Sequence, residues 1–148
     1  MIIIKKTIVT HHKSRDMYDL VKDINSYKLF LPSCKNSYII SSDNCQPNEV
    51  VVAKIEVEKL LMKTHFVSKN IYTPYQKIDI QLVSGPFSHL CGYWQFKQKQ
   101  LQCQIDFYLE YEFNNFIVAN LYSSIFRGII SQQILEAFLL RADQIYKS

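Results

Sequence analysis

Residues 105–113, Ile-Asp-Phe-Tyr-Leu-Glu-Tyr-Glu-Phe, alternate apolar with more polar side chains. The odd-numbered residues are all apolar, and three of the four even-numbered residues are acidic. An extended strand sends successive side chains to opposite faces. The stretch therefore predicts a strand of an antiparallel sheet, with one face in a core and the other in water.

The chain upstream of this strand, from Lys35 onward, shows the same pattern in shorter pieces. Ile78, Ile80 and Leu82 alternate with polar residues, and Trp94 and Phe96 do so as well. Turn-forming residues separate these pieces at 42–44, 47–48, 73–74, 84–86 and 97–100. We expect successive antiparallel hairpins that form a single sheet.

The N-terminal third predicts a strand followed by a helix. β-Branched residues dominate Ile2 to Val9, which favours a strand. Ser14 is a candidate N-cap for a helix with one buried apolar face. That face consists of Met17, Leu20, Val21 and Ile24. Residues 26–32 are too short for a second long helix and predict one or two helical turns before Pro32.

A helical segment of about 30 residues is expected after Asn114-Asn115 and up to the C-terminus, which is long for a chain of this size. Its apolar residues change face near Gly128. Those on one side are Ile117, Val118, Leu121, Tyr122, Ile125, Phe126 and Ile129, and those on the other are Ile130, Ile134, Ala137, Phe138 and Ile145. The reversal predicts a bend, a break, or an apolar outer face over 117–126 that meets a ligand, a lipid surface or a partner.

These elements predict one α+β domain spanning residues 1–148, with its helices on one face of the sheet. The chain is 48% hydrophobic and 20% charged, which is ordinary globular usage. Its length is sufficient to bury a core without disulfides or metals. The net charge of +4 is mild and scattered, so it carries little information about partners.

The cysteines and the N-terminus predict a cytoplasmic protein. The four cysteines, Cys34, Cys45, Cys91 and Cys103, form no C-x-x-C pair, and no histidine lies at a zinc-ligand spacing from them. We expect reduced thiols and no metal site. The apolar run Ile2–Ile4 is followed at once by Lys5 and Lys6, and it lacks the length and cleavage site of a signal peptide.

Catalytic motifs are absent from the sequence. With only three glycines, neither a P-loop nor a G-x-G-x-x-G loop can be written. His89 lies near Cys91 and could act in catalysis, but solvation is the favoured interpretation. The acidic pairs Glu56/Glu58 and Glu110/Glu112 are typical of the wet face of a sheet. We therefore predict no catalytic residue and no enzymatic activity.

The ten Tyr, nine Phe and one Trp raise the alternative of a nucleic-acid stacking surface. Such a surface needs cations interleaved with the aromatic rings on one exposed face. Phe107, Tyr111 and Phe113 share a face without any cation. A core or cavity lining is the favoured interpretation of these rings.

The stretch from Gly85 to Phe96 holds two of the three glycines, a proline and the single tryptophan. By its chemistry alone it predicts a rigid turn that leads into a strand. Its pattern, with the blocks around it, resembles a known family. The matching blocks are Met17-Tyr18-Asp19-Leu20-Val21, Asp23-Ile24, Tyr27, Phe30-Leu31-Pro32-x-Cys34, Gly85-Pro86-Phe87-x-x-Leu90-x-Gly92-x-Trp94-x-Phe96 and Ala137-Phe138-x-x-Arg141-Ala142-x-x-x-Tyr146.

These blocks resemble the family of the ribosome association toxin RatA and the coenzyme Q-binding proteins, within the START and polyketide-cyclase-like superfamily. The resemblance implies a helix-grip fold of the START and Bet v 1 type, a curved antiparallel sheet wrapped around a long C-terminal helix. It also implies a tunnel that holds ubiquinone or another lipid. The lipid would be a ligand, no cofactor would be needed, and the role would be to support respiration. The residues predicted to line it are Ile80, Leu82, Phe87, Trp94, Phe96, Phe107, Leu109, Tyr111, Ile134, Ala137 and Phe138.

The same resemblance leaves other functions open. A RatA-type toxin would bind the large ribosomal subunit and block subunit association, and a polyketide-cyclase-like enzyme is the third alternative. The fold alone does not distinguish these functions, because the superfamily includes proteins of all three kinds. Tyr27-Lys28 replaces the Tyr-Pro that is usual in the family, and Ser88 and His89 replace lysines, which weakens the case for ribosome contact. Lipid binding is the favoured function of the three. We expect a monomer that makes transient contact with a membrane surface.

Overall fold

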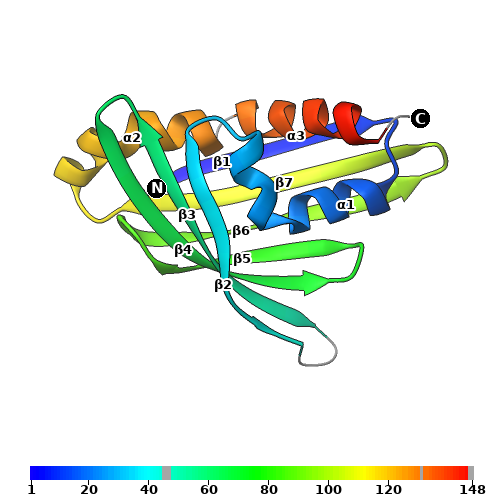
Figure 1. The fold of residues 1–148 in the computed structure, drawn as a ribbon, viewed down its shortest axis with the longest axis horizontal. Coiled ribbons are helices and arrows are strands. Elements are labelled where there is room, and N and C mark those ends of the chain that lie inside the picture. The colour runs from blue at the N-terminus through cyan, green and yellow to red at the C-terminus, as the bar shows by residue number, and fades with distance from the viewer. Residues whose placement is uncertain (45–47, 131, 147–148) are drawn as a thin grey trace.

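Within the residues that the computed structural model describes, 1–44, 48–130 and 132–146, seven strands form one curved antiparallel sheet (Figure 1). The strand order is β1-β7-β6-β5-β4-β3-β2, so each neighbouring pair from β2 to β7 is a hairpin and β1 closes against β7. The strands are β1 (Ile2–Thr10), β2 (Cys34–Asp43), β3 (Glu49–Lys59), β4 (Met62–Thr73), β5 (Lys77–Ser84), β6 (Phe87–Lys99) and β7 (Gln102–Phe113). The predicted run of antiparallel hairpins is confirmed.

The helices cover one side of this sheet (Figure 1). They are α1 (Ser14–Lys22), the 3-10 helix η1 (Ile24–Leu29), α2 (Phe116–Ile130) and α3 (Gln132–Ile145). A single cluster of buried residues joins their inner faces to the sheet. The helix-grip architecture expected from the sequence is therefore present.

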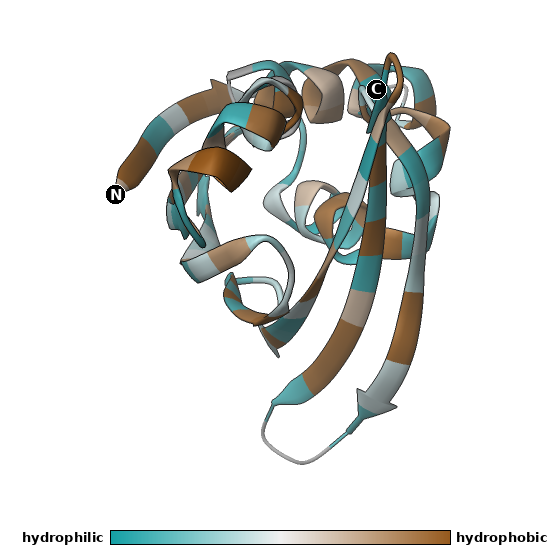
Figure 2. Cartoon of the chain, turned by 90° about the vertical axis from the view of Figure 1, so that its left-hand side faces the viewer, coloured by the Kyte–Doolittle hydropathy of each residue, from teal (hydrophilic) through white to brown (hydrophobic). Residues whose placement is uncertain are grey.

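The alternation along β7 is confirmed residue by residue. Its five odd-numbered apolar residues from 105 to 113 are all buried, whereas the side chains between them are half-buried or exposed. Figure 2 shows hydrophobic and hydrophilic residues alternating along the strands. This period of two gives the sheet one face against the helices and one face in water.

The N-terminal elements agree with the prediction except at the helix cap. Met17, Leu20 and Val21 are buried on α1, as predicted. Lys13, and not Ser14, occupies the N-cap position, and no side chain caps the helix. The Ser14 amide lies inside the helix and donates to Gln98 Oε1 at 2.8 Å. A side chain from the β6 end therefore satisfies one of the N–H groups that the helix N-terminus leaves without an intrahelical partner.

The change of apolar face predicted near Gly128 takes the form of an apolar outer face, and the described helical segments there are α2 and α3. The outer side of α2 is apolar, with Phe116, Ile117 and Leu121 exposed, while Ile125 and Phe126 are buried. The side chains of Ile129 and Ile130 lie outside the described part, as do Cys45 and Pro47. Among the described residues no helix has the length and apolar character to cross a membrane.

The β3–β4 and β6–β7 turns carry no glycine, and only the second of them was predicted from the sequence. The β3–β4 turn holds Leu60 and the β6–β7 turn holds Gln100, both with positive φ, at 58° and 54°. Non-glycine residues adopt this conformation at some cost. The β6–β7 turn is shorter than the predicted 97–100, because Lys97 and Lys99 are still paired within β6.

Gly92 of the β6 motif lies where the sheet backbone approaches most closely. A Cβ there would be 2.1 Å from the Tyr108 carbonyl oxygen and 2.9 Å from the Leu109 Cα. We expect Gly92→Ala to lower the free energy of unfolding by about 3 kcal/mol, the upper end of overpacking costs, because backbone cannot move aside. Denaturant unfolding measures this. Gln102→Ala, at an exposed position, should change stability by less than about 0.5 kcal/mol, and equal stability of both variants would contradict the steric explanation.

Candidate functional site

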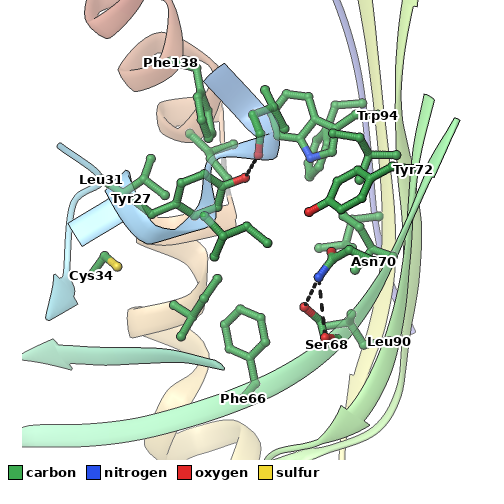
Figure 3. Close-up of a pocket in the computed structure, with 18 residues that line it drawn as sticks. Tyr27, Leu31, Cys34, Phe66, Ser68, Asn70, Tyr72, Leu90, Trp94 and Phe138 are labelled. Atoms are coloured by element: carbon green, nitrogen blue, oxygen red, sulfur yellow. Dashed lines mark hydrogen bonds between the residues drawn. The ribbon is translucent and has the colours of Figure 1, made fainter. Parts of the chain in front are cut away.

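An apolar cavity of about 80 Å³ lies between the helices and the inner face of the sheet (Figure 3). Its walls come from α1, η1, α3 and six strands. The residues that line it are Val21, Ile24, Tyr27, Leu31, Cys34, Ile55, Phe66, Ser68, Asn70, Tyr72, Ile78, Ile80, Leu90, Trp94, Phe107, Leu109, Ile134 and Phe138.

Six of the residues predicted to line a tunnel lie on this wall. They are Ile80, Trp94, Phe107, Leu109, Ile134 and Phe138. Four of them point inward from β5, β6 and β7, and the other two come from α3. The inward-facing strand residues and the apolar residues of α3 therefore line the same cavity.

Five predicted residues lie away from it. Phe87 and Tyr111 pack together under α2, where the Phe87 ring centroid is 4.8 Å from that of Phe126. Phe96 packs against Tyr18 of α1, and Leu82 is half-buried beyond the last β5–β6 pair. The inward face of the sheet is long enough to meet three different helices, so pointing inward does not by itself place a residue at the cavity.

Ala137 is the fifth misplaced residue. It lies in a shallow outer groove beside Phe30 and Arg141. A helix turns by about 100° per residue, so Ala137 and Phe138 share a broad stripe but not one direction. The cavity is reached from α3 by Ile134 and Phe138.

The contribution of β4 to the cavity was not predicted from the sequence. Phe66, Ser68, Asn70 and Tyr72 point inward, and all four are buried. The residues between them include two apolar ones that are only half-buried, Val67 and Ile71. Apolar residues of a strand usually face the core and polar residues face solvent, but Ser68 and Asn70 are the inner residues here. Hydrophobicity alone therefore could not show which face of β4 points inward.

These β4 side chains give the cavity one polar wall. The Asn70 Nδ2 donates to Ser68 Oγ at 3.1 Å and to the Val51 carbonyl at 3.4 Å. The Tyr72 hydroxyl points into the cavity, and the indole nitrogen of Trp94 faces the same space (Figure 3). Within the described chain neither the hydroxyl nor the indole N–H has a hydrogen-bond partner. Neither donor is among the fully buried unpartnered atoms of the described residues, so both are open to the cavity and placed to donate to a ligand acceptor.

The cavity is electrically neutral. No Asp, Glu, His, Lys or Arg is found among the described residues that line it. Burial raises the pKa of the Tyr27 and Tyr72 hydroxyls and of the Cys34 thiol, so these groups stay protonated at neutral pH. An uncharged ligand suits this site, because a charged one would be desolvated without a counter-charge.

Aromatic rings close the side of the cavity next to the helices. The Phe138 ring lies 5.3 Å from the rings of Tyr27 and Trp94 and 5.2 Å from that of Phe30, edge to face in each case. The Tyr27 hydroxyl donates to the Val21 carbonyl, which ties η1 to α1. Access to the cavity from this side requires Phe138 to move.

On the opposite, outer face of the sheet, His89 contacts Glu110 and Cys91. Its Nε2 is 3.0 Å from Glu110 Oε2 and 3.6 Å from Cys91 Sγ. Burial, and then the Glu110 carboxylate, raise the pKa of the Cys91 thiol. The thiol is therefore not activated as a nucleophile. Cys34, Cys91 and Cys103 are all free within the described chain.

Comparison with known proteins agrees with this fold. The family described as polyketide cyclase / dehydrase and lipid transport matches residues 10–138. The ribosome association toxin RatA of Escherichia coli (strain K12) is 33% identical over 146 residues, covering 98% of this chain and 89% of that protein. The coenzyme Q-binding protein COQ10 homolog B of Xenopus laevis is 30% identical over 135 residues, covering 88% and 53%.

A solved START superfamily protein from Mycobacterium smegmatis superimposes with a TM-score of 0.70 at 18% identity, over 97% of this chain and 98% of that one. At this identity the superposition concerns the fold alone. The family match spans most of the sequence, and it agrees with the curved sheet and its covering helices. The chain belongs to the polyketide cyclase / dehydrase and lipid transport family.

Proposed function

We propose that this chain binds an uncharged isoprenoid lipid, ubiquinone or a related quinone, in the cavity and carries out no reaction on it. The observation that supports this most is an apolar, uncharged cavity with two unpartnered donors on one wall, Tyr72 and Trp94. A quinone ring offers carbonyl acceptors and no charge. The name of the Xenopus relative supports the same ligand class.

The energetics favour an isoprenoid over a fatty acid. Each buried methylene contributes about 0.8 kcal/mol, so part of a polyprenyl chain binds without a charged anchor. A fatty acid would bring a carboxylate into a cavity that has no cation among its described lining residues. General acid or base chemistry on a polyketide would need a lining group that titrates near neutral pH, and the pKa of each ionisable lining group, Tyr27, Tyr72 and Cys34, is raised. We therefore place this chain among the binding members of its family, acting in the cytoplasm as a monomer.

Binding requires the cavity to expand. Its volume of about 80 Å³ is well below the roughly 300–1,000 Å³ typical of ligand pockets. Movement of Phe138 with α3, away from Trp94, would enlarge it from the helix side. The exposed apolar residues Phe116, Ile117 and Leu121 on α2 would contact the membrane surface while lipid is exchanged.

The direct test is mass spectrometry of organic extracts. Protein purified from quinone-containing cells should carry a quinone, and lipid-free protein should acquire one from vesicles. Protein that carries no lipid and takes up none would contradict the proposal and leave ribosome association as the favoured function.

Tyr72→Phe tests the polar wall. The hydroxyl is expected to donate to a quinone carbonyl, so its loss should weaken quinone binding by about 2- to 10-fold, equivalent to roughly 0.5–1.5 kcal/mol. Binding of a polyprenyl hydrocarbon without carbonyls should not change. Tyr93→Phe, on the outer face of the sheet, is the matched control. Equal losses for the quinone and the hydrocarbon would contradict the hydrogen bond.

Ribosome association is the second candidate, supported by the name of the Escherichia coli relative and its coverage of nearly the whole chain. If this chain binds the large subunit through phosphate contacts, sedimentation with subunits should weaken steeply with salt. Lys99→Ala should reduce binding more than Lys97→Ala, because the Lys97 Nζ lies 3.5 Å from Asp106 Oδ2 and is partly neutralised. Association that does not change with salt or with either substitution would contradict phosphate contacts by Lys97 and Lys99.

A further inference from the structure

The His89, Cys91 and Glu110 side chains bring three different metal-ligating atoms together on the outer face of the sheet. The imidazole Nε2, the thiol Sγ and a carboxylate oxygen all lie within 4.8 Å of one another. This His89–Cys91–Glu110 cluster is separate from the cavity, which lies on the other face. Quinone binding in the cavity does not use it.

Sheet pairing fixes the cluster. Cys91 on β6 lies directly opposite Glu110 on β7. His89 precedes Cys91 by two residues, so both side chains leave the same face of β6. Three ligands on two paired strands are therefore held by the backbone of the sheet. This juxtaposition was not visible as a sequence spacing, because Glu110 is distant in the chain.

The distances agree with a tetrahedral site. With Zn–N and Zn–O of about 2.0–2.1 Å and Zn–S of about 2.3 Å, tetrahedral angles place N and S about 3.6 Å apart and N and O about 3.3 Å apart. The observed separations are 3.6 Å from His89 Nε2 to Cys91 Sγ and 3.0 Å from Nε2 to Glu110 Oε2. Small side-chain rotations suffice to reach the metal geometry.

The same atoms do not form a nucleophilic triad. In a Cys-His-acid triad the two imidazole nitrogens serve different partners, one the nucleophile and the other the acid. Here His89 Nε2 is the atom nearest to both the thiol and the carboxylate. Three donors that converge on one point match a shared cation better than a proton relay.

The surroundings also match a metal site. The Tyr108 hydroxyl donates to the second carboxylate oxygen, Glu110 Oε1, at 3.1 Å, as outer-shell groups do for metal-binding carboxylates. The side chains of His89 and Glu110 are 41% and 27% exposed, so an ion can enter from solvent. We propose that the His89–Cys91–Glu110 cluster binds a borderline divalent cation, Zn²⁺ foremost, with the fourth position open to water.

The test uses tag-free, full-length protein titrated with Zn²⁺ against a chromophoric chelator, and with Co²⁺ as a spectroscopic substitute. We expect one Zn²⁺ per chain and a thiolate-to-cobalt charge-transfer band. Cys91→Ser should abolish the band, and His89→Gln and Glu110→Gln should each weaken Zn²⁺ binding by more than about tenfold, the loss that even an outer-shell change can cause.

Two controls distinguish this site from other surface histidines. His65 lies opposite Glu56 on β3 and β4, a cross-strand His–Glu pair without a cysteine, so His65→Gln should leave affinity unchanged. His11, His12 and Asp143 form another group of metal-ligating side chains, and it contains no sulfur. Binding lost on His11→Gln but retained on Cys91→Ser, or a Co²⁺ complex without the charge-transfer band, would overturn the proposal.

Discussion

Ile134→Trp is expected to abolish quinone retention while leaving the protein folded. Ile134 projects from α3 into the cavity, where the free volume is about 80 Å³. An indole there would occupy the space that the ring or tail of the ligand needs. Overpacking itself costs about 1–3 kcal/mol, so circular dichroism must first show a folded variant. Mass spectrometry of vesicle-exposed protein then measures the retained quinone.

Ala137→Trp is the matched control on the same helix. Ala137 faces the outer groove beside Phe30 and Arg141, so the same bulky side chain should leave quinone retention close to that of the unmodified protein. If both variants lose quinone equally, the loss would reflect disturbance of α3 and not occupation of the cavity. If Ile134→Trp retains quinone in full, the ligand does not occupy this space.

Phe138→Ala is expected to cause the largest loss of stability. The Phe138 side chain is 1% exposed and contacts the rings of Tyr27, Phe30 and Trp94. Truncating a buried phenylalanine typically costs about 3–5 kcal/mol, through lost burial and the remaining cavity. The free energy of unfolding from denaturant titration measures the effect.

Leu140→Ala is a control two residues further along α3. Leu140 is 61% exposed, so its truncation should change stability by less than about 0.5 kcal/mol. A loss below about 1 kcal/mol for Phe138→Ala would contradict the role of this ring in joining η1 and α3 to the sheet.

The architecture could be predicted from the sequence where side-chain period and position agree. Along β7 every second residue is apolar, and the strand is buried on that face as expected. The exposed apolar side of α2 was visible as the change of apolar face near Gly128. The turn at Leu60 was not visible, because residues 59–62 contain none of the usual turn-forming residues although Leu60 adopts a positive φ.

The cavity could be predicted only in part. Sequence period shows which way Phe87 and Trp94 point, but only the curvature of the sheet decides that Trp94 meets the cavity while Phe87 meets α2. Ser68 and Asn70 lie on the inner face of β4 although they are polar. Their polarity predicts the solvent-facing side of the sheet, which is wrong for this strand. The polar wall could therefore be found only from the structure.

Trp94 provides the most direct measurement of quinone binding in this cavity. It is the single tryptophan of the chain and lies on the cavity wall, so its fluorescence reports on that site alone. Quinones quench indole fluorescence on contact. Titration of lipid-free protein with ubiquinone should give quenching that saturates at one quinone per chain, and a polyprenyl hydrocarbon should compete for it. Quenching that does not saturate, or that equals the quenching of free tryptophan amide under the same conditions, would contradict quinone binding in the cavity.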